Sequence, residues 1–392
     1  MKICIISNFY KPHSIGGAER VAEATAEEFA RLGHRVFVIT TQSERGSTLE
    51  NQSGVKVYRF HQTNICRYSD LKKHNIFFKM FWHFFNEFNI GAYFKVKKIL
   101  IADKPDAIIT HNLMGMGFTV PAAIRNLKIK HIHVVHDVQL ASIGIIVKSK
   151  ENSFLVNGSL VKIYRLINRW LFSSPAIVVS PSEWLMKFYD KRGFFKNSKR
   201  IVLQNPLTNP FDSAKTPKKT KTGNFLCINQ LERHKGIEWL VDFWRKNNIK
   251  NELLICGKGS LLNNEKFIKE LPSSVKIIET MSADEQQITF VNYDFFIMPS
   301  LCYENSPTVI PLAYQNGTPV IVSDIGGSVE LVENGKTGFT FLPGDNSSFL
   351  AALNKAIGLS NEKYAEMSRA CLERSKSLIV DNYVKKLIDM VF

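Results

Sequence analysis

Short apolar runs alternate with amphipathic stretches along the first half of the chain. Residues 2–7 form an apolar run of strand length, residues 18–32 carry apolar side chains roughly at helical spacing, and residues 35–40 form a second apolar run. This order predicts the strand–helix–strand unit from which parallel sheets are built. Further strands are predicted at residues 55–61, 105–110, 131–135, 176–180 and 201–204.

The second half of the chain repeats this order after a segment of different composition. Residues 206–223 are rich in proline, threonine and lysine, which is typical of a linker. The pattern therefore predicts two α/β domains, residues 1–205 and residues 206–377, followed by a helix at about residues 378–392. Strands of the second domain are predicted at residues 225–229, 253–256, 275–278, 294–298 and 319–322.

The stretch of residues 293–317 combines an apolar run, a polar loop and the start of a helix. The loop covers residues 299–306, and the helical pattern begins at Pro307 with Ser306 as its candidate N-cap. Free N–H groups and the positive end of the helix dipole attract an anion at such a position. Glu304 lies in the loop, where a carboxylate accepts hydrogen bonds from sugar hydroxyls. The stretch predicts a site for a phosphorylated sugar.

Two glycines and two histidines also occupy positions that suit a ligand site. Gly16 and Gly17 precede the first predicted helix, where they allow either close approach of a ligand or a tight turn. Their spacing differs from the dinucleotide fingerprint. His136 and His111 follow predicted strands, and side chains at such positions face the ligand crevice of an open α/β sheet. A structural role is the alternative for a lone histidine.

Three loop residues of the second domain are expected to gather at one crevice. Lys235 stands just before a helix, which is a natural position for a diphosphate partner, although a solvated lysine is the alternative. Gly257 follows a predicted strand, as Glu304 does. The carboxyl ends of parallel strands meet at one edge, so these residues are predicted to form one site.

Residues 68–100 have an unusual composition, with many aromatic residues and lysines. Seven aromatic side chains lie on one broad helical face, and six lysines flank it. An aromatic face bordered by cations suits a membrane interface, and a helix packed in the core or against the other domain is the alternative. The aromatic residues are Phe77, Phe78, Phe81, Trp82, Phe84, Phe85 and Phe88, and the lysines are Lys72, Lys73, Lys79, Lys95, Lys97 and Lys98.

Composition and charge restrict the class of protein. The chain has 392 residues, of which 45% are hydrophobic, and lacks an apolar run long enough to cross a membrane. Its six scattered cysteines and short apolar N-terminus predict a reduced cytoplasmic protein without a zinc site. A net charge of +16 favours nucleotides or anionic lipid as partners, or reflects a lysine-rich solubilising surface. No nucleic-acid motif is present, so no nucleic-acid partner is predicted.

Motifs along nearly the whole chain resemble those of family 4 glycosyltransferases, which have the GT-B fold. In the first half they are Gly16-Gly17-Ala18-Glu19, Val135-His136-Asp137, Ser180-Pro181-Ser182 and Asn205-Pro206. In the second half they are Leu231 with Lys235-Gly236, Pro299-Ser300, Glu304-Asn305-Ser306-Pro307-Thr308-Val309, Asn316-Gly317-Thr318-Pro319-Val320-Ile321 and Gly326-Gly327 with Glu330.

The resemblance implies two Rossmann-like domains that face each other across a cleft, with the C-terminal helix packed back on the first domain. The first domain binds the acceptor and the second binds the nucleotide sugar. The sugar is transferred with retention of anomeric configuration and without a metal or a cofactor, since the nucleotide sugar is a co-substrate.

The resemblance also implies roles for individual residues. Gly17, beside Gly16, allows approach of the donor phosphate, and His136 contacts the donor sugar. Lys235 stabilises the leaving phosphate, and Glu304 holds sugar hydroxyls as an orienting group. The backbone N–H groups of the following segment contact the sugar and phosphate, the residues concerned being Asn305, Ser306, Pro307 and Thr308.

The chain departs from the family pattern at two donor-site positions. Leu312 replaces a glutamate that grips the ribose, and Pro311 is expected to distort the adjoining helical turn. Gln230 replaces an arginine, for which Arg233 is the candidate substitute. These changes favour, as an alternative, a catalytically weakened relative that binds sugar or a partner transferase. Sugar-nucleotide epimerases and phosphorylases of the same fold are further alternatives.

Relatives of this type in bacteria build cell-surface polysaccharides such as lipopolysaccharide. The resemblance therefore implies a glycan or lipid-linked saccharide as acceptor. A cytoplasmic location at the inner face of the membrane follows, with residues 68–100 as the peripheral membrane contact.

Overall fold

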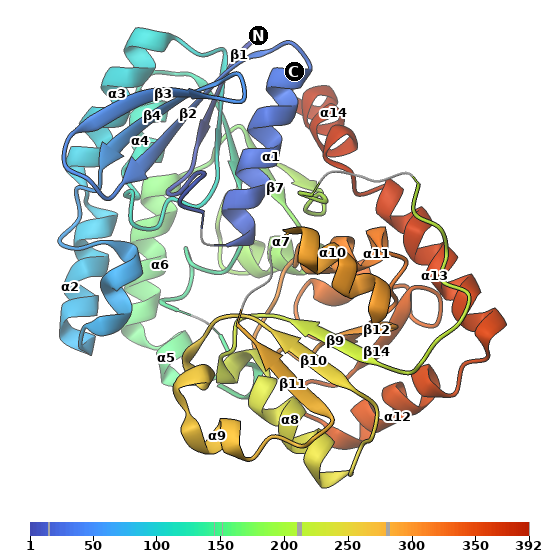
Figure 1. The fold of residues 1–392 in the computed structure, drawn as a ribbon. Coiled ribbons are helices and arrows are strands. Elements are labelled where there is room, and N and C mark those ends of the chain that lie inside the picture. The colour runs from blue at the N-terminus through green and yellow to red at the C-terminus, as the bar shows by residue number, and fades with distance from the viewer. Residues whose placement is uncertain (15, 145, 151, 210–213, 280–282, 392) are drawn as a thin grey trace. The chain divides into compact units, whose positions relative to one another are not determined.

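The chain forms two compact units. The computed structural model describes residues 1–14, 16–144, 146–150, 152–209, 214–279 and 283–391 (Figure 1). The first unit comprises Met1–Gly144, Phe154–Gln204 and Val380–Phe392, and the second comprises Ile145–Ser153 and Asn205–Ile379. The predicted boundary after residue 205 lies one residue beyond the point where the chain enters the second unit.

The first unit is built on a sheet whose described strands follow the order β3-β4-β2-β1-β5-β6-β7-β8. Neighbouring strands run parallel, except that β3 is antiparallel to β4. In the central strand β1, all side chains from Ile3 to Ile6 are buried, as expected for a parallel sheet covered on both faces. The strands are β1 (Lys2–Ile6), β2 (Arg35–Gln42), β3 (Ser47–Gln52), β4 (Val55–His61), β5 (Ala107–Thr110), β6 (Lys130–Val134), β7 (Ile177–Ser180) and β8 (Lys199–Val202).

Two helices that are far apart in sequence complete the core of this unit. Tyr383, Val384 and Leu387 of the last helix, α14, join Ile3 and Val21 in one buried apolar cluster. The helices of the unit are α1 (Gly17–Arg31), α2 (Ile76–Glu87), α3 (Ile90–Asp103), α4 (Val120–Asn126), α5 (Phe154–Asn157), α6 (Ser159–Phe172), α7 (Glu183–Asp190) and α14 (Val380–Val391), with a 3-10 helix η1 (Tyr68–Lys73).

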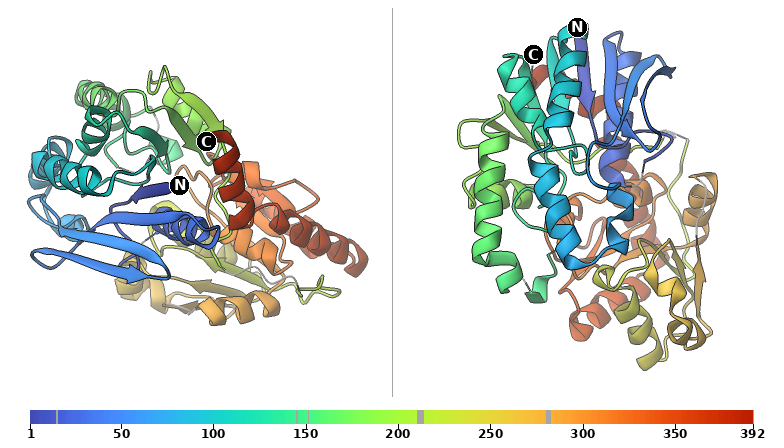
Figure 2. Two further views of the ribbon diagram at one scale, coloured as in Figure 1. Left: turned by 90° about the horizontal axis from the view of Figure 1, so that it is seen from above. Right: turned by 90° about the vertical axis from the view of Figure 1, so that its left-hand side faces the viewer.

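The aromatic segment is not one continuous helix. It forms η1, α2 and α3, and the break after α2 follows from Asn89, whose side chain accepts the Ala92 N–H as the N-cap of α3. Of the aromatic side chains, Trp82 is buried, whereas Phe77 is 72% exposed and Phe81 is 64% exposed. The predicted alternative of a core helix is therefore wrong for most of this face. Figure 2 shows α2 beside α6.

The second unit is built on a parallel sheet whose described strands follow the order β11-β10-β9-β12-β13-β14. The strands are β9 (Phe225–Ile228), β10 (Leu253–Cys256), β11 (Val275–Ile278), β12 (Phe295–Met298), β13 (Val320–Ser323) and β14 (Gly338–Phe341). The α-helices are α8 (Ile237–Lys246), α9 (Glu265–Lys269), α10 (Ala283–Asn292), α11 (Val309–Gln315), α12 (Asn346–Ile357) and α13 (Asn361–Lys376). The 3-10 helices are η2 (Lys148–Lys150), η3 (Arg233–Lys235), η4 (Ser260–Asn263) and η5 (Ser328–Leu331).

A buried carboxylate ties the end of the predicted linker to this sheet. Oδ2 of Asp294 accepts hydrogen bonds from the backbone N–H groups of Thr222, Gly223 and Asn224, at 2.8, 2.6 and 3.1 Å. It also accepts the hydroxyl hydrogen bond of Thr222 at 2.9 Å. The Asp294 side chain thus holds residues 222–224 immediately before β9.

The helices that the structure describes include none with the length and hydropathy needed to cross a bilayer.

Candidate functional site

In the first unit, the two predicted histidines lie against each other. They follow the parallel neighbours β5 and β6, so the sheet register brings them together. Nδ1 of His111 lies 2.9 Å from Nε2 of His136, and the rings are stacked with centroids 5.2 Å apart. Burial lowers the pKa of His136 to about 4, and burial together with the neighbouring histidines lowers the pKa of His111 well below its ordinary value. At neutral pH both imidazoles are uncharged, so one donates the shared hydrogen bond and the other accepts it.

Two carboxyl groups also belong to this end of the unit, Glu19 in the first turn of α1 and Asp137 directly after His136 in the chain. Glu19 is buried and accepts the backbone N–H of Gly16, which is the N-cap of α1, at 2.8 Å. Burial raises the pKa of Glu19. Burial also raises the pKa of Asp137 to about 6, and the charge of Glu19 adds to this increase. Gly17 is the first residue of α1.

In the second unit, the two principal predicted residues form an ion pair. Nζ of Lys235 lies 2.5 Å from Oε1 of Glu304, and both side chains are less than one-fifth exposed. The Ser300 hydroxyl donates to the same Oε1 at 2.9 Å. Burial alone would lower the pKa of Lys235, but the attraction of Glu304 outweighs burial and raises it. Lys235 therefore keeps its positive charge at neutral pH, although it is largely buried.

Two glycines allow the loops around the Lys235–Glu304 pair to pack closely against each other. Gly236 has a φ of +76°, and a Cβ there would lie 1.9 Å from the carbonyl oxygen of Pro299. At Gly257, with a φ of +156°, a Cβ would lie 1.7 Å from the carbonyl oxygen of Asn229. Both positions therefore require glycine. The Gly236 contact brings the segment that carries Lys235 against the loop that carries Glu304.

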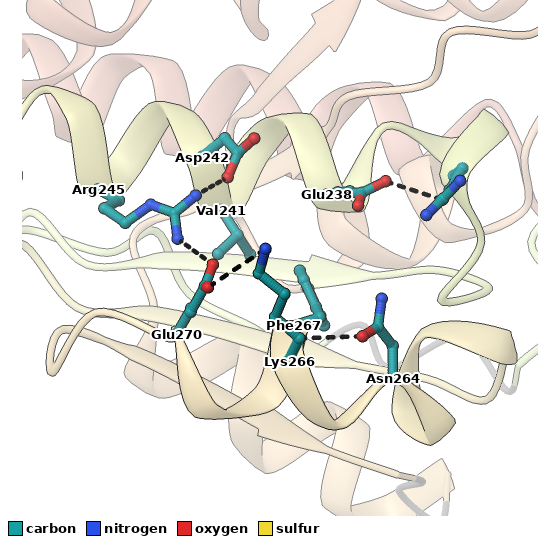
Figure 3. Close-up of a pocket in the computed structure, with 9 residues that line it drawn as sticks. Glu238, Val241, Asp242, Arg245, Asn264, Lys266, Phe267 and Glu270 are labelled. Carbon is teal, nitrogen blue, oxygen red and sulfur yellow. Dashed lines mark hydrogen bonds and ion pairs between the residues drawn. The ribbon is translucent and has the colours of Figure 1, made fainter.

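Arg233 has a different partner from the one expected. Its Nε lies 3.0 Å from a carboxylate oxygen of Glu238, and its side chain is 74% exposed. It borders a polar hollow of about 320 Å³ between α8 and α9, shown in Figure 3. The other residues that line the hollow are Glu238, Val241, Asp242, Arg245, Asn264, Lys266, Phe267 and Glu270. Gln230 is exposed, while Leu231 beside it is buried.

The helix after the 299–306 loop begins two residues later than predicted. α11 starts at Val309 with Thr308 as its N-cap. Ser306 does not cap it, because its hydroxyl accepts the Asn205 N–H at 3.1 Å and its carbonyl accepts from the Asn205 side chain at 2.8 Å. Pro307 has no N–H to offer a ligand, and its carbonyl accepts the Ile310 N–H at 3.2 Å. Asn305 is buried beside them.

The expected distortion at Pro311 is absent from α11. Pro311 is the third residue of the helix, where the N–H of an ordinary residue has no intrahelical partner, so proline removes no hydrogen bond there. Leu312 is 4% exposed and belongs to an apolar cluster with Met298 and Ile310. The structure therefore assigns Leu312 to the core, and its side chain contacts apolar residues.

Several neighbours of the predicted site residues were not assigned a role from sequence. Ser300, Glu19 and Asp137 stand inside the motifs quoted above, so the signal was present. The contacts of these three side chains could not be predicted from the sequence, because each contact forms only where two loops meet at the edge of a sheet.

Two family models match almost the whole chain. The model described as Glycosyltransferase Family 4 matches residues 15–207, and the model described as Glycosyl transferases group 1 matches residues 208–374. The chain belongs to the family 4 glycosyltransferases and has the GT-B fold of two Rossmann-like units.

Individual relatives and one solved structure are similar to this chain. An uncharacterised 42.6 kDa protein from the cps region of Klebsiella pneumoniae is 24% identical over 333 residues, covering 84% of this chain and 87% of that protein. An Escherichia coli UDP-Gal:alpha-D-GlcNAc-diphosphoundecaprenol alpha-1,3-galactosyltransferase is 32% identical over 149 residues, covering 35% of this chain and 37% of the relative. The structure of Anabaena HepE in complex with UDP and glucose is similar with a TM-score of 0.70 at 17% identity, covering 100% of this chain and 99% of the other.

Proposed function

We propose that this protein transfers a sugar, with retention of anomeric configuration, from a nucleotide sugar to a glycan or lipid-linked saccharide in cell-surface polysaccharide synthesis. The observation that carries the proposal is the Lys235–Glu304 pair, held at 2.5 Å by the loops at one sheet edge of the second unit. Lys235 is charged and largely buried, which suits it to stabilise the diphosphate that leaves as the sugar is transferred. Glu304 orients Lys235 and offers acceptor oxygens to the hydroxyls of the donor sugar.

The proposed reaction needs neither a metal ion nor a cofactor, because Lys235 supplies the charge that neutralises the leaving group. Glu304 is not assigned as a nucleophile, since its carboxylate is engaged with Lys235 and Ser300. His136 is proposed to contact the donor sugar as a neutral imidazole. The remaining proposed donor contacts are Gly16, Gly17, Gln230, Gly257 and the backbone N–H groups of Asn305, Ser306 and Thr308.

When the protein is incubated with a nucleotide sugar and an acceptor, it is expected to release nucleoside diphosphate. This release should depend on both the donor and the acceptor. UDP-sugars are the first donors to test, because HepE was solved with UDP and the E. coli relative is named for UDP-Gal. A thermal-shift screen with UDP, GDP, ADP and CMP identifies the nucleotide, since a ligand that binds only the folded state raises the Tm. Absence of turnover with all common nucleotide sugars and a verified acceptor would contradict the proposal.

A catalytically weakened relative is the second candidate, and Leu312 favours it. A leucine within the core cannot hold ribose hydroxyls, and loss of such a contact costs about 1–3 kcal/mol of binding free energy. A protein of this kind binds a nucleotide in the thermal-shift screen but releases no nucleoside diphosphate from any nucleotide sugar in the assay.

The acceptor is proposed to be lipid-linked, and an apolar face of the first unit supports this. We use the term aromatic face for the exposed apolar side chains on α2 with its C-cap residue Phe88, on α3 and on α6, which include Trp170 at 67% exposure and Phe94 at 62%. Glu87 and Asp103 are the only acidic residues in these three helices; the Glu87 side chain is buried, and that of Asp103 pairs with Lys2 at 2.7 Å. The face consists of Phe77, Met80, Phe81, Phe84, Phe85, Phe88, Ile90, Phe94, Ile101, Leu160, Ile163, Leu166 and Trp170.

The chemistry of the aromatic face matches an anionic membrane surface. Large exposed apolar patches are uncommon on monomeric soluble proteins. The charged residues at exposed positions of these three helices are all basic, which favours an anionic surface as the partner. The basic residues in them are Lys79, Lys95, Lys97, Lys98, Lys162, Arg165 and Arg169. We therefore propose that the protein works at the inner face of the cytoplasmic membrane, with residues 68–100 and α6 as the contact.

Flotation with vesicles is expected to show binding to phosphatidylcholine mixed with phosphatidylglycerol, and weaker binding at high salt. Trp170→Ser and Phe81→Ser are each expected to reduce the floated fraction several-fold, because each removes a large exposed apolar side chain from the face. Leu49→Ser is the matched control, since Leu49 is 58% exposed in the same unit but lies on β3. Equal loss in the control, or no flotation at low salt, would refute the membrane contact.

A further inference from the structure

A short segment of the second unit is separated in sequence from the rest of that unit. Residues 146–150, which we term the strap, lie between two stretches of the first unit along the chain. The Tyr303 N–H donates to the Ile146 carbonyl at 3.1 Å, and the Lys148 N–H donates to the Leu301 carbonyl at 3.0 Å. Val147 stands directly opposite Cys302 in this antiparallel pairing. The strap is therefore joined by a single antiparallel β-bridge to the loop that carries Glu304.

The paired part of the loop lies close to the proposed donor residues. The Leu301 N–H donates to the His234 carbonyl at 3.0 Å, so Leu301 is bonded to η3 through its N–H and to the strap through its carbonyl. Cys302 is 1% exposed, and its Sγ lies 4.0 Å from Oε1 of Glu304. The backbone just before Glu304 is thus held by η3 on one side and by the strap on the other. These two contacts set the position of Glu304 relative to Lys235.

Contacts at its first residue also fix the strap in place. The Ile146 side chain is 2% exposed, whereas Lys148 and Lys150 are exposed. The Lys150 N–H donates to the Val147 carbonyl at 2.9 Å, which closes the 3-10 turn η2. The strap therefore acts on the loop through its backbone and through Ile146, whereas the side chains of Lys148 and Lys150 are exposed.

We propose that the strap is a positioning segment that holds the 299–306 loop in the arrangement in which Glu304 meets Lys235. Its effect on turnover rests on the proposed donor role of these two residues. The strap is paired with Leu301, Cys302 and Tyr303, so it acts on Glu304 through these residues. Loosening it raises the KM for the nucleotide sugar and lowers kcat, while the KM for the acceptor stays unchanged.

Lys148→Pro removes one hydrogen bond of the strap with little other change. Lys148 is the first residue of η2, a position where the fixed φ of proline is compatible with a helix and its missing N–H breaks no intrahelical bond. Val147 before it takes part in a β-bridge, and an extended residue is what a following proline requires. Lys148→Ala is the matched control, because it removes the same side chain and keeps the N–H.

The test compares the wild type, Lys148→Ala and Lys148→Pro by amide hydrogen exchange and by donor kinetics. For Lys148→Pro, exchange across residues 301–303 is expected to be roughly three- to tenfold faster and donor KM to rise by a similar factor, the range that loss of one hydrogen bond gives. Lys148→Ala is expected to match the wild type in both. The melting temperature is expected to stay within about 2 °C of the wild type in both variants.

Unchanged exchange in Lys148→Pro would overturn the proposal, because the strap would then not hold the loop. Faster exchange with unchanged donor KM and kcat would also overturn it, since the strap would then be only structural. If the wild type releases no nucleoside diphosphate from any donor, the proposed function fails. The exchange comparison, which needs no substrate, still decides in that case whether the strap holds the loop.

Discussion

Lys235→Ala is expected to lower kcat/KM for the nucleotide sugar by roughly two to three orders of magnitude, as removal of a preorganised electrostatic group does in other enzymes. The side chain is 17% exposed and its ammonium is held at 2.5 Å from Glu304, so it is positioned before any donor binds. The free energy of unfolding is expected to fall by only about 1–3 kcal/mol, because Glu304 keeps its hydrogen bond from Ser300. Steady-state kinetics and urea unfolding measure the two effects.

A second substitution separates catalysis from stability. Glu304→Gln in the Lys235→Ala background removes the carboxylate that has lost its partner, so it is expected to restore stability without restoring turnover. Lys336→Ala is the control, because Lys336 pairs with Glu333 at 2.6 Å on the surface and is 67% exposed. Turnover that recovers together with stability would show that Lys235 is only structural.

Asp294→Ala is expected to destabilise the second unit by about 3–5 kcal/mol, one of the largest effects of a single substitution in this chain. One carboxylate oxygen accepts four hydrogen bonds from residues 222–224, and the side chain is 6% exposed. Alanine leaves buried backbone donors such as the Gly223 N–H without a partner, and each such donor costs about 1–3 kcal/mol. Differential scanning calorimetry should show the unfolding transition lowered by about 10 °C.

Asp242→Ala is the matched control for this prediction. Asp242 is 40% exposed and pairs with Arg245 three residues away on the same helix, a contact worth less than about 1 kcal/mol. If Asp294→Ala shifted the transition no more than Asp242→Ala, the linker would be held by other contacts than this carboxylate.

The sequence predicted the repeated strands and helices well, because buried parallel strands are marked by continuous apolar runs. Residues 253–256, all four of them buried, coincide with β10. Residues 275–278 coincide with β11, although only Val275 of this edge strand is buried. Strand β3 was not predicted, since its sequence STLENQ is polar and it is an exposed edge strand. Strand β14 (Gly338–Phe341) was also missed, because a short run that begins with glycine has little strand signal.

The candidate site was predictable only in part. Sequence position placed Lys235 and Glu304 at one sheet edge, and the structure brings them into contact. Arg233 was expected to join the site in place of the missing arginine. In the structure it pairs instead with Glu238 on α8. The burial of Leu312 depends on how α11 packs, and the family pattern alone suggested a position facing a ligand.

The contacts of the strap and of the histidine pair could not be predicted from the sequence either. Nothing in the sequence of residues 146–150 indicates a partner at residues 301–303, since an isolated bridge has too few residues to leave a pattern. His111 and His136 were each predicted at a strand end, but their hydrogen bond depends on the register of β5 and β6.

The packing of α14 on the first unit has a consequence for synthesis of the chain. Tyr383, Val384 and Leu387 are at most 3% exposed and complete a core whose residues outside α14 lie between Ile3 and Leu203. During translation the first unit therefore presents an open apolar surface until residues 380–391 have been made. By then the residues of the second unit, which ends at Ile379, have been made as well, so the first unit cannot complete its core before synthesis of the second unit is over.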